Sequence, residues 1–158
     1  MISFIVFFPL IGFIYCAFFG KFFGDRNSQL VTNILLFISA ILSWIIFFKY
    51  LGPTNTTTLQ FFNWMTSGTF SVDWSLRVDA LTATMLIVVT TVSSCVHLYS
   101  IGYMNEDKSI SRFMGYLSLF TFFMLVLVTS DNLLQMFFGW EGVGLTSYLL
   151  IGFWHHKE

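Results

Sequence analysis

The chain has 158 residues, of which 56% are hydrophobic and 9% are charged, whereas about 25% of the residues of an ordinary soluble domain are charged. A soluble fold of this size cannot cover so much apolar surface, so the composition indicates a membrane protein. The net charge of −1 provides no basic field for nucleic acid, which excludes that class of partner. Cys16 and Cys95 lie in apolar runs without metal-ligand spacing and are expected to be buried thiols.

Five apolar stretches approach the length of about 20 residues that crosses a bilayer as a helix. Backbone groups in lipid must be satisfied within their own segment, so each stretch is expected to be helical. The predicted transmembrane helices are 2–20, 30–48, 80–102, 113–130 and 132–154. We therefore expect an all-α membrane protein in which residues 1–158 form a single transmembrane unit.

Several residues mark the ends of these helices. The first stretch lacks the charged start and cleavage site of a secretory signal and is expected to be retained, with Pro9 either kinking the helix or marking a late start. Gly52-Pro53 ends the second helix. Asp79 is predicted to cap the third. The candidate caps of the last two helices are Ser109 and Ser111 for the fourth and Asp131 for the fifth.

The long connection over 51–79 is predicted to hold a small β-hairpin. Apolar and polar residues alternate over 70–78, which is typical of a half-buried strand. Leu59–Met65 is expected to pair with this strand across Thr66-Ser67-Gly68. The hairpin lies in the outer loop between helices 2 and 3.

The positive charges favour one orientation in the membrane. With alternating crossings, five basic residues fall on one side and two on the other: Lys21, Arg26, Lys108, Arg112 and Lys157 against Lys49 and Arg77. The positive-inside rule then places the N-terminus in the intermembrane space or periplasm and the C-terminus in the matrix or cytoplasm.

Glu141 is the first candidate for chemistry, because it lies two positions from the middle of the fifth predicted helix. An acidic residue at a helix centre costs about 2.5–3.5 kcal/mol on insertion scales, so its side chain must face protein or water. Desolvation favours the neutral acid and a nearby cation favours the carboxylate, so the group can carry a proton. The alternative is a carboxyl that stays neutral or only joins two helices. Gly139, Gly142 and Gly144 let another helix or water approach.

His97 is a second candidate, as a relay of protons. It shares a helical face with Thr90, Ser93 and Ser100, and an imidazole in water titrates near pH 6.5. The alternative is a structural or interfacial role, because hydroxyls in membrane helices often bond the carbonyls of their own helix. Glu106-Asp107-Lys108 is expected to be a solvated loop, and adjacent His155-His156 share no helical face. No metal or cofactor site is predicted.

Two stretches carry a resemblance to a known family: WSLRVDALTATMLIVVTTVSSCVHLYSIGYM over 74–104 and the region 112–154, which includes DNLLQMFFGWEGVGLTSYLLIGFW. They resemble the N-terminal region of NADH dehydrogenase (ubiquinone) subunit 5, the antiporter-like membrane subunit of respiratory complex I, a family related to Mrp-type sodium/proton antiporters. In this resemblance Glu141, within GWEGVG, matches the essential intramembrane glutamate of the family.

The resemblance implies proton translocation coupled to NADH:ubiquinone electron transfer, with no redox chemistry in this chain. FMN, iron–sulfur clusters and ubiquinone would be used by other subunits. The implied partners are other membrane-arm subunits, membrane lipids and, because the partner lysine of the glutamate would fall beyond Glu158, a second chain of a split subunit. The implied location is the mitochondrial inner membrane or, alternatively, the bacterial plasma membrane. The alternative functions are an Mrp-type antiporter subunit and a structural scaffold of the membrane arm.

Overall fold

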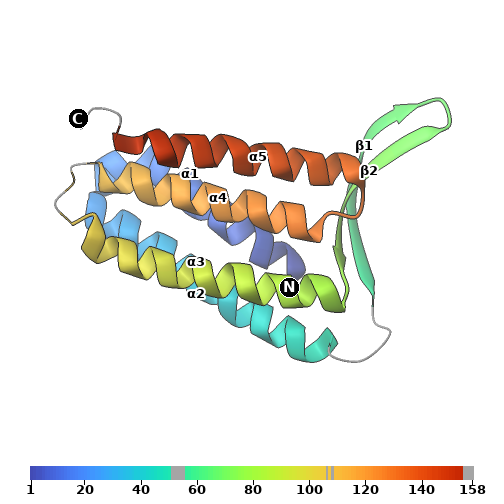
Figure 1. Ribbon diagram of the computed structural model, residues 1–158, viewed down its shortest axis with the longest axis horizontal. Helices are drawn as coiled ribbons and strands as arrows, with labels where there is room; N and C mark the ends of the chain where they lie inside the picture. The colour runs from blue at the N-terminus through green and yellow to red at the C-terminus, as the bar shows by residue number, and fades with distance from the viewer. Residues whose placement is uncertain (51–55, 106, 108, 155–158) are drawn as a thin grey trace.

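The computed structural model describes residues 1–50, 56–105, 107 and 109–154. Five of its helices are long and apolar enough to cross a membrane, and a two-stranded hairpin lies between the second and third, as predicted. The order of elements is α1 (Ile2–Phe23), α2 (Asp25–Tyr50), β1 (Thr57–Ser67), β2 (Phe70–Val78), α3 (Ala80–Tyr103), α4 (Ile110–Thr129), α5 (Leu133–Ile151) and a short 3-10 turn η1 (Gly152–Trp154) (Figure 1).

The largest difference from the predicted boundaries is at the start of α2. This helix begins at Asp25 rather than Leu30, and a single glycine, Gly24 with φ of 84°, separates it from α1. Apolar runs mark the part of a helix that lies in lipid, and the polar first turn of α2 carried no such signal. α1 begins at Ile2 and runs without interruption through Pro9. The alternative in which Pro9 marks a late start of this helix is therefore wrong. The predicted features at Gly52-Pro53, Glu106, Lys108 and His155-His156 lie outside the described residues.

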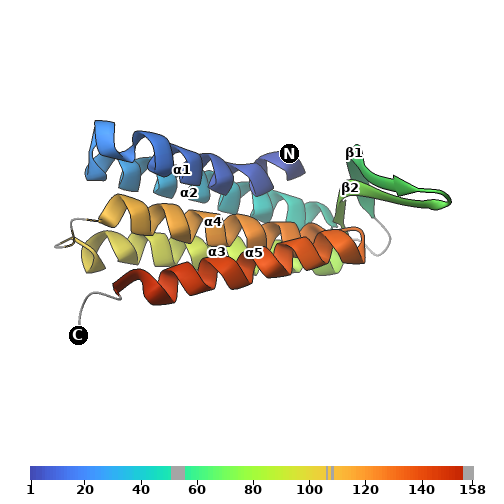
Figure 2. The same ribbon diagram turned by 90° about the horizontal axis from the view of Figure 1, so that it is seen from above.

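α4 occupies the centre of the helix bundle. It packs against α1, α2 and α3 on one side and against α5 on the other (Figures 1 and 2). The main apolar core joins α1, α2, α3, α4 and β2, with Ile5, Leu86 and Leu125 fully buried. α5, all of which is described, contributes no large apolar side chain to this core. Its buried residues are Gln135, Gly139, Gly142 and Thr146.

The hairpin sits at one end of the bundle, and its tip extends away from the helices (Figure 1). β1 and β2 are antiparallel; β1 is longer than predicted at both ends, whereas β2 covers the predicted residues. Gly68, with φ of 61°, permits the tight turn between them. β1 is exposed along its length, whereas Val72, Leu76 and Val78 of β2 are buried against the helix ends. β2 is therefore the strand that connects the hairpin to the bundle.

Candidate functional site

Glu141 lies one residue from the midpoint of α5, as the sequence predicts. Its side chain is on the exposed face of α5, which also carries Phe137, Trp140, Leu145 and Tyr148. This face points away from α4. Among the residues that the structure describes, no side chain forms an ion pair or hydrogen bond with Glu141. A carboxylate at this depth therefore needs polar partners from outside the described helices.

The opposite face of α5 approaches α4 unusually closely. An added Cβ at Gly139 would lie 2.8 Å from the backbone N and Cα of Leu127. At Gly142 the added atom would overlap the ring of Phe123. Thr146 continues this face and donates its hydroxyl to Gly142 O at 2.8 Å. The glycines predicted to admit another helix therefore admit α4, whereas Gly144 lies on the open side with no atom within 4 Å of an added Cβ.

His97 is fully buried between α3 and α4. Its Nδ1 is 2.9 Å from the carbonyl oxygen of Ser93, which can only accept, so Nδ1 carries a proton. Its Nε2 is 3.1 Å from the hydroxyl of Ser118, which donates to it. Ser93 also contacts Thr121 through their hydroxyls. A neutral imidazole thus has both nitrogens satisfied and joins two helices.

His97 and Glu141 are not brought together. Ser118 and Thr121 face α3, whereas Phe123 and Leu127 face α5, so α4 separates the two candidates. The other hydroxyls of the predicted polar face mostly donate to their own helix: Thr90 to Leu86 O, Ser94 to Thr90 O and Ser100 to Val96 O. The described contacts account for His97 as a strut between helices, and its role as a relay stays a prediction.

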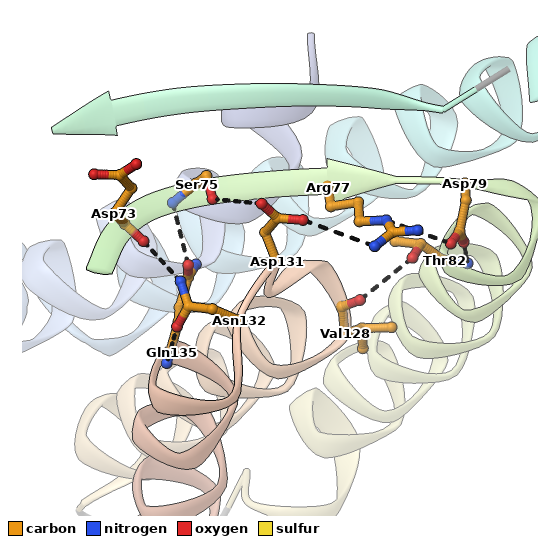
Figure 3. Close-up of polar contacts among 9 residues, drawn as sticks. All are labelled: Asp73, Ser75, Arg77, Asp79, Thr82, Val128, Asp131, Asn132 and Gln135. Carbon is orange, nitrogen blue, oxygen red and sulfur yellow. Dashed lines mark hydrogen bonds and ion pairs between the residues drawn. The ribbon is translucent and has the colours of Figure 1, made fainter. Parts of the chain in front are cut away.

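A polar cluster joins β2 to the turn between α4 and α5 (Figure 3). We call it the hairpin cluster; it comprises Asp73, Ser75, Arg77, Asp79, Asp131, Asn132 and Gln135. The amide of Asn132 donates to Asp73 O at 2.7 Å, and the backbone N–H of Ser75 donates to Gln135 Oε1 at 3.1 Å. The hydroxyl of Ser75 donates to Asp131 at 3.2 Å. Leu76 and Ser130 form an isolated β-bridge beside these contacts.

Arg77 connects the two helix starts of the hairpin cluster. Its Nε is 3.8 Å from Asp79 Oδ2 and its Nη1 is 3.9 Å from Asp131 Oδ1. Asp79 caps α3 by accepting the N–H of Thr82 at 2.8 Å, as predicted. This hydrogen bond is the main reason why the pKa of Asp79 lies below its usual range. Because the side chains are one-third to one-half exposed, the ion pairs themselves contribute little.

The expected cap of α5 is wrong by one residue. Asn132, not Asp131, is the N-cap, and its side chain accepts the N–H of Gln135 at 2.8 Å. Asp131 contacts β2 instead. Both residue types cap helices well, so the sequence alone could not separate the two neighbours. Ser109 is the N-cap of α4, although its side chain makes no capping hydrogen bond. Cys16 is buried as expected, but Cys95 is exposed.

The sequence did not identify Gln135 and Ser75 as site residues. Gln135 is fully buried, and its Nε2 has no hydrogen-bond partner among the described residues. A buried amide near the start of an apolar helix was the available signal, because such a group is costly unless it is hydrogen-bonded. Ser75 gave no comparable signal, since its backbone N–H is the donor.

Two family profiles match the chain. Residues 64–114 match the family described as NADH-ubiquinone oxidoreductase (complex I), chain 5 N-terminus. Residues 130–158 match the family described as NADH:quinone oxidoreductase/Mrp antiporter, TM. Together they include β2, α3, the turn between α4 and α5, and Glu141.

Similar proteins include chains of NADH-ubiquinone oxidoreductases and of NADH-quinone oxidoreductases. NADH-ubiquinone oxidoreductase chain 5 is 51% identical over 154 residues in Chondrus crispus and 53% identical over 150 residues in Arabidopsis thaliana. NADH-quinone oxidoreductase subunit L of Rhodobacter capsulatus is 49% identical over 164 residues. These alignments cover 97%, 95% and 99% of this chain but 23%, 22% and 23% of the relatives. The chain belongs to the family of NADH-ubiquinone oxidoreductase chain 5 and NADH-quinone oxidoreductase subunit L, and it corresponds to the N-terminal part of these proteins.

Proposed function

We propose that this chain acts in the membrane arm of respiratory complex I, where it takes part in proton translocation driven by NADH:quinone electron transfer. Glu141 carries the proposal, because it is a carboxylate at the midpoint of a membrane-spanning helix. The electron-transfer groups, FMN, iron–sulfur clusters and ubiquinone, are assigned to other subunits. Family membership supports this assignment, and the chain spans less than a quarter of the length of the relatives it matches.

Proton transfer follows from the surroundings that Glu141 requires. At mid-membrane the neutral acid is favoured when no charge is near, and the carboxylate is favoured when a cation approaches. A movement that brings a cation to the exposed face of α5 and removes it would make Glu141 release and regain a proton. The cation must come from protein that covers this face, because none of the described residues supplies it.

Replacement of Glu141 tests the carrier role. Glu141→Gln keeps size and hydrogen bonding but removes the ionisable group, so the number of protons translocated per NADH is expected to fall in the assembled complex. Glu141→Asp keeps the carboxyl and is the matched control, with at least partial pumping. Full stoichiometry in Glu141→Gln, measured in sealed vesicles, would show that this residue carries no proton.

An Mrp-type antiporter subunit is the second candidate, because the profile matched by residues 130–158 is described for both kinds of protein. The two functions differ in what drives the protons. A complex I subunit translocates protons when NADH is oxidised, whereas a sodium/proton antiporter responds to a sodium gradient. A structural scaffold is disfavoured, since a scaffold has no need of a carboxylate at mid-membrane.

The rest of the family's fold is expected to cover the exposed face of α5. The prediction that a second polypeptide supplies it is tested by identifying the proteins that co-purify with this chain in mild detergent. A co-purifying chain similar to the later part of subunit 5 would support it. Purification of a single polypeptide that contains both parts would contradict it.

We infer that the N-terminus and hairpin face the intermembrane space or periplasm. The N-terminus of α1 lies toward the hairpin end of the bundle, so both lie on one side of the membrane (Figure 1), and the distribution of basic residues indicates which side. The mitochondrial inner membrane is the proposed location, and the bacterial plasma membrane is the alternative. Protease added to the outer side of intact vesicles is expected to cut the exposed hairpin. Cleavage from the matrix or cytoplasmic side alone would reverse the orientation.

A further inference from the structure

The hairpin cluster holds the start of α5, and the direction of the Glu141 side chain depends on how this start is held. α5 starts directly after the α4–α5 turn, and Glu141 is six residues after Gln135. At about 100° per residue, Glu141 is therefore about 120° around the helix from Gln135. Gln135 is fully buried against β2, whereas Glu141 is exposed. Whatever holds Gln135 in place also determines where Glu141 points.

Apolar packing contributes one anchor to this setting, because Phe138 packs against Trp74 of β2 and Phe123 of α4, with ring centroids 5.2 and 5.8 Å away. The residues that α5 buries are two glycines, one glutamine and one threonine, and the threonine donates to its own helix. The glycines define which face meets α4, because Leu127 and Phe123 occupy the space beside them. A face built from small residues lets the two helices approach closely, but apart from Phe138 it offers few large side chains that would interlock against rotation.

The hairpin cluster adds polar attachments to this aromatic contact. Asn132 and Gln135 bond to Asp73 and Ser75 of the same strand, so two points on α5 are fixed to two points on β2. Two attachments of this kind fix the position of the helix start and its rotation. Asp131 adds a third contact through the hydroxyl of Ser75 (Figure 3). β2 is itself fixed in the core by Leu76 and Val78, which are 1% and 0% exposed.

We propose that Gln135 and Asp131 are positioning residues that set the rotation of α5 and thereby align Glu141 with its cationic partner. The inference rests on the proposed carrier role of Glu141. Side chains of a helix extend to about 5–6 Å from the axis, so a 20° rotation moves the carboxylate by about 2 Å. Lengthening a carboxylate–cation separation from 4 to 6 Å at an effective dielectric constant of 20 changes the protonation equilibrium about tenfold.

The reaction of Glu141 with dicyclohexylcarbodiimide tests this alignment. The reagent is lipid-soluble and attacks protonated carboxyls, so its rate reports the protonated fraction. Gln135→Met keeps the length of the side chain but removes the oxygen that accepts the N–H of Ser75. In the assembled complex at alkaline pH, we expect Glu141 to be labelled about tenfold faster in this variant, with the rate profile displaced by about one pH unit. Mass spectrometry locates the label.

The controls separate positioning from general damage. Gln60→Met makes the same chemical change on the exposed strand β1 and is expected to leave the profile unchanged. Asp131→Ala leaves the core filled, because Asp131 is about one-third exposed, and is expected to displace the profile in the same direction by less. Unchanged labelling of Glu141 in both cluster variants would overturn the proposal. Failure of both variants to assemble would also overturn it, since the cluster would then serve folding alone.

The two proposals fail in different measurements. If Glu141→Gln kept full proton stoichiometry, Glu141 would not be a proton carrier. The labelling comparison would still report how α5 is oriented. If labelling were unchanged in Gln135→Met, Gln135 would not position Glu141, but Glu141 could still carry a proton.

Discussion

At the scale of single residues, Asp79 links the hairpin to α3 by accepting the backbone N–H of Thr82. Replacement of an N-cap by alanine typically costs about 1 kcal/mol, whereas asparagine caps as well as aspartate. Asp79→Ala is therefore expected to lower the thermal midpoint of the detergent-solubilised protein by about 2–4 °C. Asp79→Asn is the matched control and should stay close to wild type. Equal losses in both variants would assign the effect to the ion pair with Arg77 instead.

The same cap predicts a dependence of stability on pH. The pKa of Asp79 is lowered in the folded protein, chiefly by the N–H of Thr82. Its contribution is therefore present above the unfolded pKa of about 3.9 and is lost as the pH falls through the lowered folded value. Between pH 7 and pH 3, unfolding measurements should show a smaller loss of stability for Asp79→Asn than for wild type. An identical loss would mean that the carboxylate form of Asp79 adds nothing.

Residue identity predicted some of these roles and not others. Asp79 was recognisable because it directly precedes a long apolar run. Asp131 and Asn132 are adjacent and both suited to capping, so only the contacts with Ser75 and Asp73 distinguish them. The position of Glu141 along its helix followed from counting residues. Its direction did not, because that depends on which face of α5 meets α4.

At the scale of elements, the contact between α4 and α5 depends on Gly139. An added methyl group would meet the backbone of Leu127 at 2.8 Å, and backbone atoms of a packed helix cannot move aside as a side chain can. Gly139→Ala is expected to push the two helices apart and destabilise the protein by about 1–3 kcal/mol. Thermal unfolding in detergent, together with the yield of assembled complex, measures this effect.

Gly144→Ala is the control on the same helix. An added Cβ there meets nothing within 4 Å, and alanine favours a helix more than glycine does. Its effect on the isolated chain is therefore expected to be neutral or slightly stabilising. Equal destabilisation by the two changes would show that the close approach to Leu127 does not determine the outcome.

Hydropathy located every membrane-spanning helix but not the parts that extend beyond lipid. The polar start of α2 at Asp25 and the full length of β1 were missed for this reason. The hairpin itself was predictable from the alternation of apolar and polar residues over 70–78 and from Gly68. Its attachment to the α4–α5 turn was not, because that attachment joins segments about 60 residues apart through backbone groups as well as side chains.

At the scale of the whole molecule, α5 is the least buried of the five membrane-spanning helices. Its exposed face carries Glu141 next to Trp140, which is 68% exposed. A face of lipid-soluble side chains is stable in a membrane, but a mid-membrane carboxylate among them is not. The carrier role of Glu141 therefore requires protein against this face in the working complex.

Trp140→Cys tests that requirement next to the carboxylate. Buried thiols react slowly with a lipid-soluble maleimide, so this cysteine is expected to be labelled much more slowly in the assembled complex than in the same protein denatured in detergent. The native cysteines are replaced by serine to leave one reactive site. If the new cysteine reacts equally fast in both states, Glu141 faces lipid without a partner, and a proton carrier at this position is physically untenable.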